Sequence, residues 1–491
     1  MPVWLLLIAP VATAALCWIV ESPSLITLIS VLGSVLCFAV CGWQSWSVLA
    51  GGPLVGSGLR LDALGAYLAL IISAIALAAS LASGEFMRHE AESEKLGPDS
   101  WKVYYGLFHL FVATMLLVPI ADNLGILWVA VEATTLSSAF LVGFHRHHHA
   151  VEAAWKYVIL CSVGLAFALF GTILLYYAGL QAGGGASLSW THFMEISARM
   201  DPKIVKLGLL FVVLGYGTKA GLAPMHTWLP DAHSQAPSPV SAMLSGVLLT
   251  SAFYALVRFY AIAMPCLGPA FLSRVFLFFG LGSLAIAAPF ILVARDYKRL
   301  LAYSSVEHMG FMALGLGIGT PLAVYGTLLH LLCHALAKSL AFLSAGRILH
   351  AFGTRKITKV AGALSVAPEA GFFFLAAVLG LCGLPPFGIF LSELIVLSQG
   401  FASGRILASV AAGALLVTVF AGLLYHAIGM SFGQVRRTLP ARRPDPRRLW
   451  EWMITAALLL VPLVLLGCWI PAALDAWLSL MARIVLGGSR G

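Results

Sequence analysis

About fourteen apolar stretches, each close to 20 residues long, run through the 491-residue chain. A helix rises about 1.5 Å per residue, so about 20 apolar residues cross the hydrocarbon core of a bilayer. Only 10% of the residues are charged, against about 25% in soluble proteins, so the charges cannot cover a surface that faces water. The sequence therefore predicts an all-α integral membrane protein and excludes a soluble enzyme and a disordered chain. The stretches lie near residues 3–20, 24–42, 61–83, 103–120, 123–142, 156–178, 204–228, 238–262, 272–294, 300–319, 322–349, 367–399, 405–432 and 452–481.

Glycines and prolines interrupt two of these stretches at membrane depth. They are Gly221, Pro224 and Pro230 at the seventh stretch, and Gly383, Pro385 and Pro386 in the twelfth. A broken helix frees backbone carbonyls, which a membrane protein tolerates only where protein encloses them or a wet cavity reaches them. Breaks in corresponding halves of a chain are typical of inverted-repeat transporters, whose ion path passes the breaks. We therefore expect two broken helices that flank an ion path.

Positive charges alternate between the predicted loops. Of the 29 Lys and Arg residues, 18 lie in odd-numbered loops and eight lie in even-numbered loops or the C-terminal tail. The positive-inside rule then predicts a multi-pass protein of the cell (inner) membrane with both termini on the non-cytoplasmic side. The net charge of +9 follows from this bias, so no nucleic acid is expected as a partner. Residues 1–491 are predicted to form a single polytopic membrane domain.

Six charged side chains lie within apolar stretches instead of loops. They are Lys219, Arg258, Lys338, Glu132, Glu307 and Glu393. A charge at the bilayer centre costs about 2.5–3.5 kcal/mol on the insertion scale, so such groups are usually buried and functional. We interpret the lysines and glutamates as a proton relay, in which a buried lysine exchanges its proton as a carboxylate approaches or leaves. The alternative is a static ion pair between Glu132 and Lys219. The sequence suggests no role for Arg258.

Histidines extend the predicted relay. His330, His334 and Lys338 are spaced by four residues and so lie on one face of a helix. A metal ion there would lack further ligands on that helix and would be repelled by Lys338, so a titratable ladder is favoured over a metal site. Glu307 and His308 are candidates to lengthen the ladder, and His226 and His233, near the seventh break, are candidates for a second branch.

No cofactor and no metal ion are predicted. The eight cysteines lack C-x-x-C spacing and lie mostly in apolar stretches, unlike the ligands of iron–sulfur clusters or structural zinc. Four histidines cluster at a predicted cytoplasmic edge: His145, His147, His148 and His149. We expect them to be solvated there, with no role beyond adventitious metal binding.

Three segments carry a family resemblance: KAGLAPMHTWLPDAHSQAPSPVSAMLSG, ARDYKRLLAYSSVEHMGFMALG and HALAKSLAFLSAG. They resemble the antiporter-like, proton-translocating membrane subunits of respiratory complex I, Mrp-type cation/proton antiporters and group 4 hydrogenases. The resemblance runs from about residue 60 to about residue 430. The variants WVAVEATTLSSAFLVGFHR, YSSVEHMGF and LPPFGIFLSE are most similar to the hydrogenase-4 component F branch.

The resemblance implies fourteen transmembrane helices with two inverted five-helix repeats. Residues 1–100 would form peripheral N-terminal helices, 101–262 the first repeat, 263–432 the second, and 433–491 a basic cytoplasmic loop and the last helix. Glu132 would match the family's fifth-helix glutamate and Lys219 its seventh-helix lysine. Lys338 with His330 and His334 would form the central relay, and Glu393 the exit group. Thr250 stands where complex I members carry a further lysine.

The resemblance also implies a function. It favours a proton-translocating, non-redox subunit of a formate-hydrogenlyase-like hydrogenase or a related respiratory oxidoreductase. Other membrane and peripheral subunits, the lipid bilayer and protons would be its partners. One alternative is an Mrp-type sodium/proton antiporter subunit, with Asp122, Thr250 or Glu307 near the ion. Another is a structural scaffold subunit.

Overall fold

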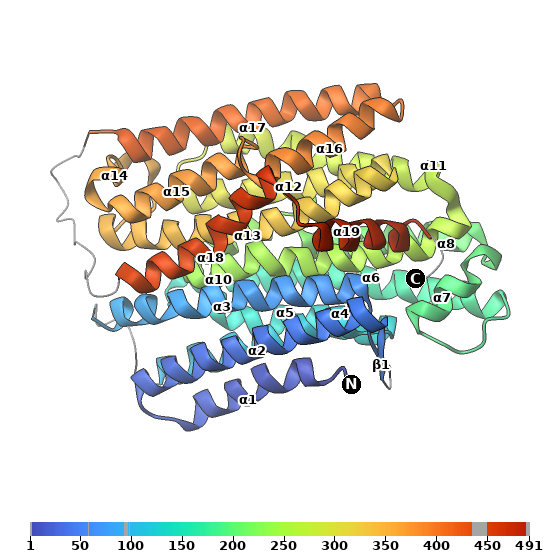
Figure 1. The fold of residues 1–491 in the computed structure, drawn as a ribbon, viewed down its shortest axis with the longest axis horizontal. Coiled ribbons are helices and arrows are strands. Elements are labelled where there is room, and N and C mark those ends of the chain that lie inside the picture. The colour runs from blue at the N-terminus through green and yellow to red at the C-terminus, as the bar shows by residue number, and fades with distance from the viewer. Residues whose placement is uncertain (1, 57, 93–96, 98, 435–448, 488–491) are drawn as a thin grey trace.

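The computed structural model describes residues 2–56, 58–92, 97, 99–434 and 449–487, and these residues form an almost wholly helical bundle. Most helices run side by side along the long axis, with α1 and α2 at one edge and α16 and α17 at the opposite edge (Figure 1). A hairpin of two short antiparallel strands, β1 (Leu54–Gly56) and β2 (Leu59–Leu61), pairs Val55 with Arg60. The predicted basic loop falls largely on residues 435–448, which lie outside the described residues.

The predicted apolar stretches correspond to helices or broken pairs of helices, and the eighth and ninth share the continuous run Ser238–Leu292. Among the described residues, nine helical runs are long and apolar enough to cross a bilayer alone, and three shorter apolar helices accompany them. The helices are α1 (Leu5–Ile19), α2 (Pro23–Gly51), α3 (Ala63–Glu92), α4 (Ser100–Ile120), α5 (Leu124–Val142), α6 (His148–Gln181), α7 (Trp190–Ile196), η1 (Ser197–Arg199), α8 (Pro202–Ala220), α9 (Trp228–Gln235), α10 (Ser238–Met243), η2 (Leu244–Leu248), α11 (Leu249–Leu292), α12 (Tyr297–Ile318), α13 (Pro321–Phe352), η3 (Ile357–Lys359), α14 (Ala363–Val366), α15 (Pro368–Leu381), α16 (Gly388–Ala402), α17 (Ile406–Phe432), α18 (Leu449–Cys468) and α19 (Ala472–Val485).

Both predicted helix breaks are present. In the seventh stretch, helix α8 ends at Ala220, because Gly221 adopts a left-handed conformation (φ +81°) that favours glycine. The chain resumes as α9 at Trp228. Pro230 is the exception to the prediction, since it lies in the first turn of α9, where a missing N–H costs no helical hydrogen bond.

The twelfth stretch is interrupted in the same way. Its first helix, α15, ends at Leu381, and the second, α16, begins at Gly388. Gly383 has φ +63°, and Pro385 and Pro386 occupy the connection. Gly221 at the first break is buried, whereas the prolines Pro224, Pro385 and Pro386 are exposed. Carbonyls at both helix ends accept hydrogen bonds, from Leu222 N at the first break and from Leu384 N at the second.

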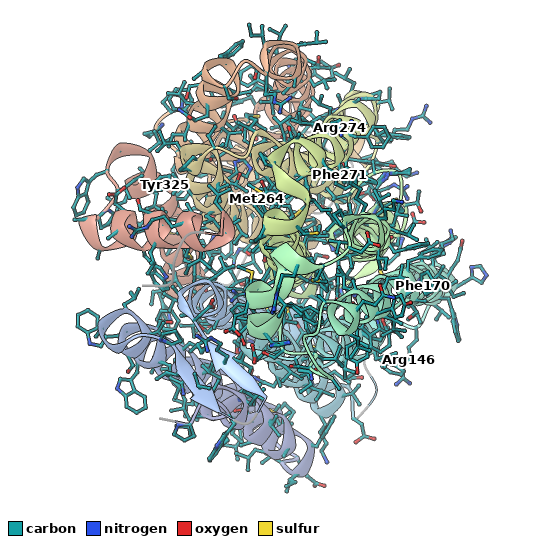
Figure 2. The ribbon with its side chains drawn as sticks, turned by 90° about the vertical axis from the view of Figure 1, so that its right-hand side faces the viewer. Arg146, Phe170, Met264, Phe271, Arg274 and Tyr325 are labelled. Atoms are coloured by element: carbon teal, nitrogen blue, oxygen red, sulfur yellow. The ribbon has the colours of Figure 1, made fainter. Side chains whose placement is uncertain are left out.

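The sequence did not predict three further irregularities. The fourteenth stretch, predicted as a single last helix, is divided into α18 and α19 between Cys468 and Ala472. A π-helical turn, η2, joins α10 to α11 in the middle of the predicted eighth span. Such turns leave a backbone carbonyl without its usual partner and often lie at functional sites. Gly268 (φ +67°) divides the long α11 run into the predicted eighth and ninth spans, and Met264 and Phe271 mark this bend in the end-on view of Figure 2.

Even-numbered loops lie at one end of the bundle and odd-numbered loops at the other. Isolated β-bridges join Leu59 to Ala121 and Asn123 to Ser189, which places three even-numbered loops together. Odd-numbered loops meet in the same way, since Asp296 bridges Lys356 and His145 lies 3.4 Å from Glu90. This arrangement agrees with the alternation of loops that the charge pattern predicts.

Helix α13 occupies the centre of the bundle. It contacts α3, α10, α12, α15, α16, α18 and α19, and its most apolar window is 94% buried. By contrast, α2, α5 and α17 expose large apolar side chains such as Trp46, Phe140 and Leu407. A protein whose outer face is apolar and whose centre carries His and Lys has the layout expected in lipid.

Candidate functional site

Lys219 lies in the last turn of α8, directly before the first break, and its side chain is fully buried. Its Nζ atom donates hydrogen bonds to Thr135 Oγ1 at 2.7 Å and to Tyr157 OH at 2.6 Å. Nζ also lies 4.5 Å from the centroid of the Tyr157 ring. The Tyr157 hydroxyl also forms a hydrogen bond with Ser138 Oγ at 2.8 Å. The lysine is therefore held by hydroxyl groups from α5 and α6.

Glu132 does not form the ion pair with Lys219 that the static alternative requires. Its Oε1 instead accepts a hydrogen bond from Ser162 Oγ at 2.6 Å. Both residues lie within the described part of the chain, and no carboxylate oxygen there is within 4.0 Å of Lys219 Nζ. Lys219 and Glu132 are therefore hydrogen-bonded to separate hydroxyl groups and do not form a salt bridge with each other.

The second cluster is a row of three imidazoles, two of which are hydrogen-bonded to each other. His308 Nδ1 lies 3.0 Å from His330 Nε2, and His330 Nδ1 lies 2.9 Å from Ser392 Oγ. The His334 ring is 5.1 Å from the His308 ring. All three histidines are fully buried. The row joins α12, α13 and α16, and an imidazole has the chemistry to take a proton on one nitrogen and release one from the other.

The π turn η2 connects to this row. His334 Nε2 lies 3.3 Å from the Ser245 carbonyl oxygen, and Ser245 Oγ lies 2.8 Å from Ser305 Oγ. Lys338 Nζ, also fully buried, donates to the Leu301 carbonyl at 2.9 Å, and Ser305 Oγ donates to the same carbonyl at 3.1 Å. Lys338 and His334 are therefore linked through two serines and the irregular backbone of η2.

Two carboxylates flank the imidazoles. Glu307 Oε2 lies 3.4 Å from His308 Nε2. Potential ligand atoms of His308, His330 and Glu393 all lie within 4.8 Å of one another. Such a group could in principle hold a metal ion, but both nitrogens of His330 already bond to His308 and Ser392. His330 would have to give up one of these hydrogen bonds to ligate a metal ion.

The second break positions Glu393. A Cβ atom at Gly383 would overlap Oε2 of Glu393, and the left-handed backbone of Gly383 disfavours any side chain by about 1–2 kcal/mol. We expect Gly383→Ala to displace Glu393 and to slow proton transfer several-fold while every titratable group remains. Proton uptake by vesicles measures this effect.

Gly404→Ala is the matched control for that substitution. Gly404 has a similar backbone (φ +76°), but a Cβ there meets no atom within 4 Å. It should reproduce the backbone strain and leave proton transfer unchanged. Equal rates in the two variants would show that Gly383 does not position Glu393.

His226 and His233 lie apart from the ladder. His226 is near the first break, with its ring 6.2 Å from Tyr303. His233 stacks on Phe342 of α13 at 4.9 Å, and its ring nitrogens have no hydrogen-bond partner among the described residues. Phe342 follows Lys338 by one helical turn. His233 therefore lies close to the Lys338 group, on the side of the odd-numbered loops.

Thr250 does not replace the lysine of complex I members. Its Oγ1 donates back to Gly246 and Val247 carbonyls of its own helix, at 3.1 and 3.0 Å. The described side chains thus form two hydrogen-bonded groups, one around Lys219 and one around Lys338 and the ladder.

The sequence did not predict the serine, threonine and tyrosine residues of the site. The hydroxyls of Thr135, Tyr157 and Ser392 bond to Lys219 or His330, whereas Ser245 contacts His334 through its backbone carbonyl. A serine or threonine in a transmembrane helix usually bonds to its own backbone, so its presence predicts little. Ser392 directly precedes Glu393 in the sequence, which is a weak indication that it belongs to the site.

Arg258 has a structural role that its sequence context did not reveal. Its guanidinium pairs with Asp62, with Nη1 at 2.7 Å from Oδ2. Tyr254 OH accepts from Arg258 Nε at 2.9 Å and donates to the Pro119 carbonyl at 3.1 Å. The guanidinium also lies 4.1 Å from a Trp190 ring centroid. This buried clamp fastens α11 to the starts of α3 and α7.

The fold and this buried row of His, Lys and Glu define a polytopic membrane protein built around broken helices. A profile described as "NADH:quinone oxidoreductase/Mrp antiporter, TM" matches residues 121–420. The chain therefore belongs to this family of antiporter-like membrane subunits.

Relatives in sequence agree with that assignment. A hydrogenase-4 component F homolog of Methylacidiphilum infernorum is 39% identical over 383 residues, which are 78% of this chain and 80% of that protein. NADH-quinone oxidoreductase subunit N of Desulforudis audaxviator is 30% identical over 431 residues, 86% of this chain and 83% of that protein.

Solved structures share the fold. A chain of the membrane-bound sulfane sulfur reductase, an archaeal respiratory membrane complex, superposes with a TM-score of 0.83 at 22% identity and covers 99% of both chains. A chain of the Mrp complex from Dietzia superposes equally well, with 20% identity over 98% of this chain and 96% of that one.

Proposed function

We propose that the chain is the proton-translocating, non-redox membrane subunit of a membrane-bound hydrogenase or related respiratory complex. The observation that carries the proposal is the buried row in which Lys338, Ser305, Ser245, His334, His308 and His330 follow one another toward Glu393. A static core gains little from burying so many titratable groups, since their desolvation is costly. The identity to a hydrogenase-4 component F homolog supports the hydrogenase branch.

The relay has two parts in this proposal. Lys219 and Glu132 form the first, and Lys338 with the imidazoles and Glu307 forms the second, with Glu393 as the exit group. His226 and His233 form a second branch of the relay on the side of the odd-numbered loops. A charge displacement at Glu132 caused by a neighbouring subunit would change the proton affinity of Lys219 and drive one proton onward. The odd-numbered loops face the cytoplasm, and both termini lie on the other side.

A deletion strain complemented with the gene tests this function. Inverted membrane vesicles are supplied in turn with formate, hydrogen and NADH, and proton uptake is followed by quenching of a pH-sensitive dye. We expect uptake with the wild type and its loss in Lys338→Met, while electron transfer persists in the presence of an uncoupler. Unchanged uptake in Lys338→Met would contradict the relay.

The same vesicles separate the two ion-transport alternatives. Replacing sodium with choline should leave proton uptake unchanged if protons alone are moved. Uptake that requires sodium, or sodium/proton exchange with none of the three electron donors present, would instead show an Mrp-type antiporter subunit.

A further inference from the structure

The histidine-rich loop divides into two unlike halves at the odd-loop end of the bundle. His148 and His149 are exposed beside Glu152 at the start of α6. His145 and His147, in contrast, line a cavity of about 490 Å³. The expectation that all four histidines are simply solvated is therefore wrong for His145, whose side chain is only 21% exposed.

Four metal-binding side chains from three elements converge on this cavity. His89 and Glu90 come from the last turn of α3, His145 from the α5–α6 loop, and His350 from the last turn of α13. Potential ligand atoms of His89, Glu90 and His350 lie within 4.8 Å of one another. His145 Nε2 lies 3.4 Å from Glu90 Oε2. The sequence separations between these residues hide the cluster from any motif search.

We infer that this cavity binds a divalent transition-metal ion of the zinc class through His89, Glu90, His145 and His350. Imidazole and carboxylate are ordinary zinc ligands, with bonds of about 2.0–2.2 Å, and a tetrahedral site then separates its ligands by about 3.4 Å. The His145–Glu90 separation already has this value. The His89 and His350 rings are stacked with centroids 3.8 Å apart, so binding one ion through both requires at least one ring to rotate out of the stack.

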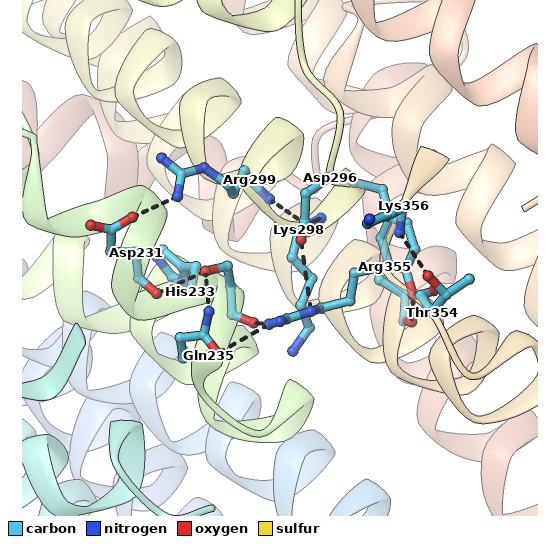
Figure 3. A network of polar contacts seen from close by, with 12 residues as sticks. Asp231, His233, Gln235, Asp296, Lys298, Arg299, Thr354, Arg355 and Lys356 are labelled. Atoms are coloured by element: carbon cyan, nitrogen blue, oxygen red, sulfur yellow. Dashed lines mark hydrogen bonds and ion pairs between the residues drawn. The ribbon is translucent and has the colours of Figure 1, made fainter. Parts of the chain in front are cut away.

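The two cations that line the cavity, Lys298 and Arg355, bond to other groups. Lys298 Nζ donates to the Ala236 carbonyl at 2.8 Å. Arg355 bonds to the Ser234 carbonyl and lies 3.7 Å from Asp296. Figure 3 shows Arg355 directed toward Gln235, with Lys298 beside it. Glu90 supplies the negative charge that a divalent ion needs in such surroundings.

Metal binding has a functional consequence that rests on the proposed function. The cavity wall includes Ser234, the neighbour of His233, so it lies where protons would approach the relay. A double positive charge there repels protons, and the repulsion is strong because the site is partly shielded from water. Zinc should therefore inhibit proton uptake.

Equilibrium dialysis of the purified protein against Zn²⁺ tests the site without any transport measurement. We expect one zinc ion per chain, with affinity at least tenfold weaker in His350→Gln and in Glu90→Gln. Co²⁺ should give the intense visible absorption of a tetrahedral site, and His350→Gln should abolish it. The unfolding temperature without metal shows whether each variant is folded.

His149→Gln is the matched control, because it disables the exposed cluster of His148, His149 and Glu152. It should keep the zinc ion and the cobalt spectrum. No zinc in the wild type, or zinc lost in His149→Gln but kept in folded His350→Gln, would overturn the inference. If zinc binds as expected but proton uptake is insensitive to it, the site stands and only the link to the proposed function fails.

Discussion

Lys219→Met is expected to abolish proton translocation while the protein still folds and assembles. The substitution keeps the apolar stem of the side chain and removes the ammonium group that bonds to Thr135 and Tyr157. No other side chain of the first group can carry a cationic proton there, because Thr135, Tyr157 and Ser138 are hydroxyls. Dye quenching in inverted vesicles should fall to the level of the deletion strain.

Two further variants sharpen this expectation. Lys206→Met removes an exposed lysine from the same helix and should leave proton uptake unchanged. Tyr157→Phe removes one of the two acceptors, so uptake should fall only in part. If Lys219→Met vesicles pump at the wild-type rate, the lysine has no part in the relay.

Arg258→Ala is expected to lower the free energy of unfolding by about 3–5 kcal/mol, the usual cost of removing one partner of a buried ion pair. The variant leaves the Asp62 carboxylate buried without its guanidinium partner and strips two hydrogen bonds from Tyr254. Unfolding of the purified protein by denaturant in detergent, followed by circular dichroism, measures the change.

Arg274→Ala is the control for that prediction, because Arg274 lies on the same helix α11 with its side chain exposed at the end of the bundle (Figure 2). Its loss should change stability by less than about 0.5 kcal/mol. The double variant Asp62→Asn/Arg258→Met should be less destabilised than Arg258→Ala, because it removes both buried charges. A double variant that is much less stable than Arg258→Ala would refute the clamp.

The sequence alone determined the membrane class, the positions of both breaks and the buried charged residues. Helix length and hydropathy are local properties, and the bilayer forces every apolar stretch to satisfy its own backbone. Gly221 and Gly383 disfavour helix continuation wherever they occur, so the breaks could also be seen locally. Lys219, Lys338 and Glu393 stood out because a charge in an apolar stretch needs a reason.

Only the tertiary structure decided how these residues are partnered. It separated Glu132 from Lys219, paired Arg258 with Asp62 across 196 positions, and brought His350 to the α3 histidine. It also introduced the π turn η2, whose carbonyl reaches His334. Such contacts depend on how helices distant in sequence pack against one another, and a hydroxyl or an imidazole carries no local signal of the partner that packing will give it.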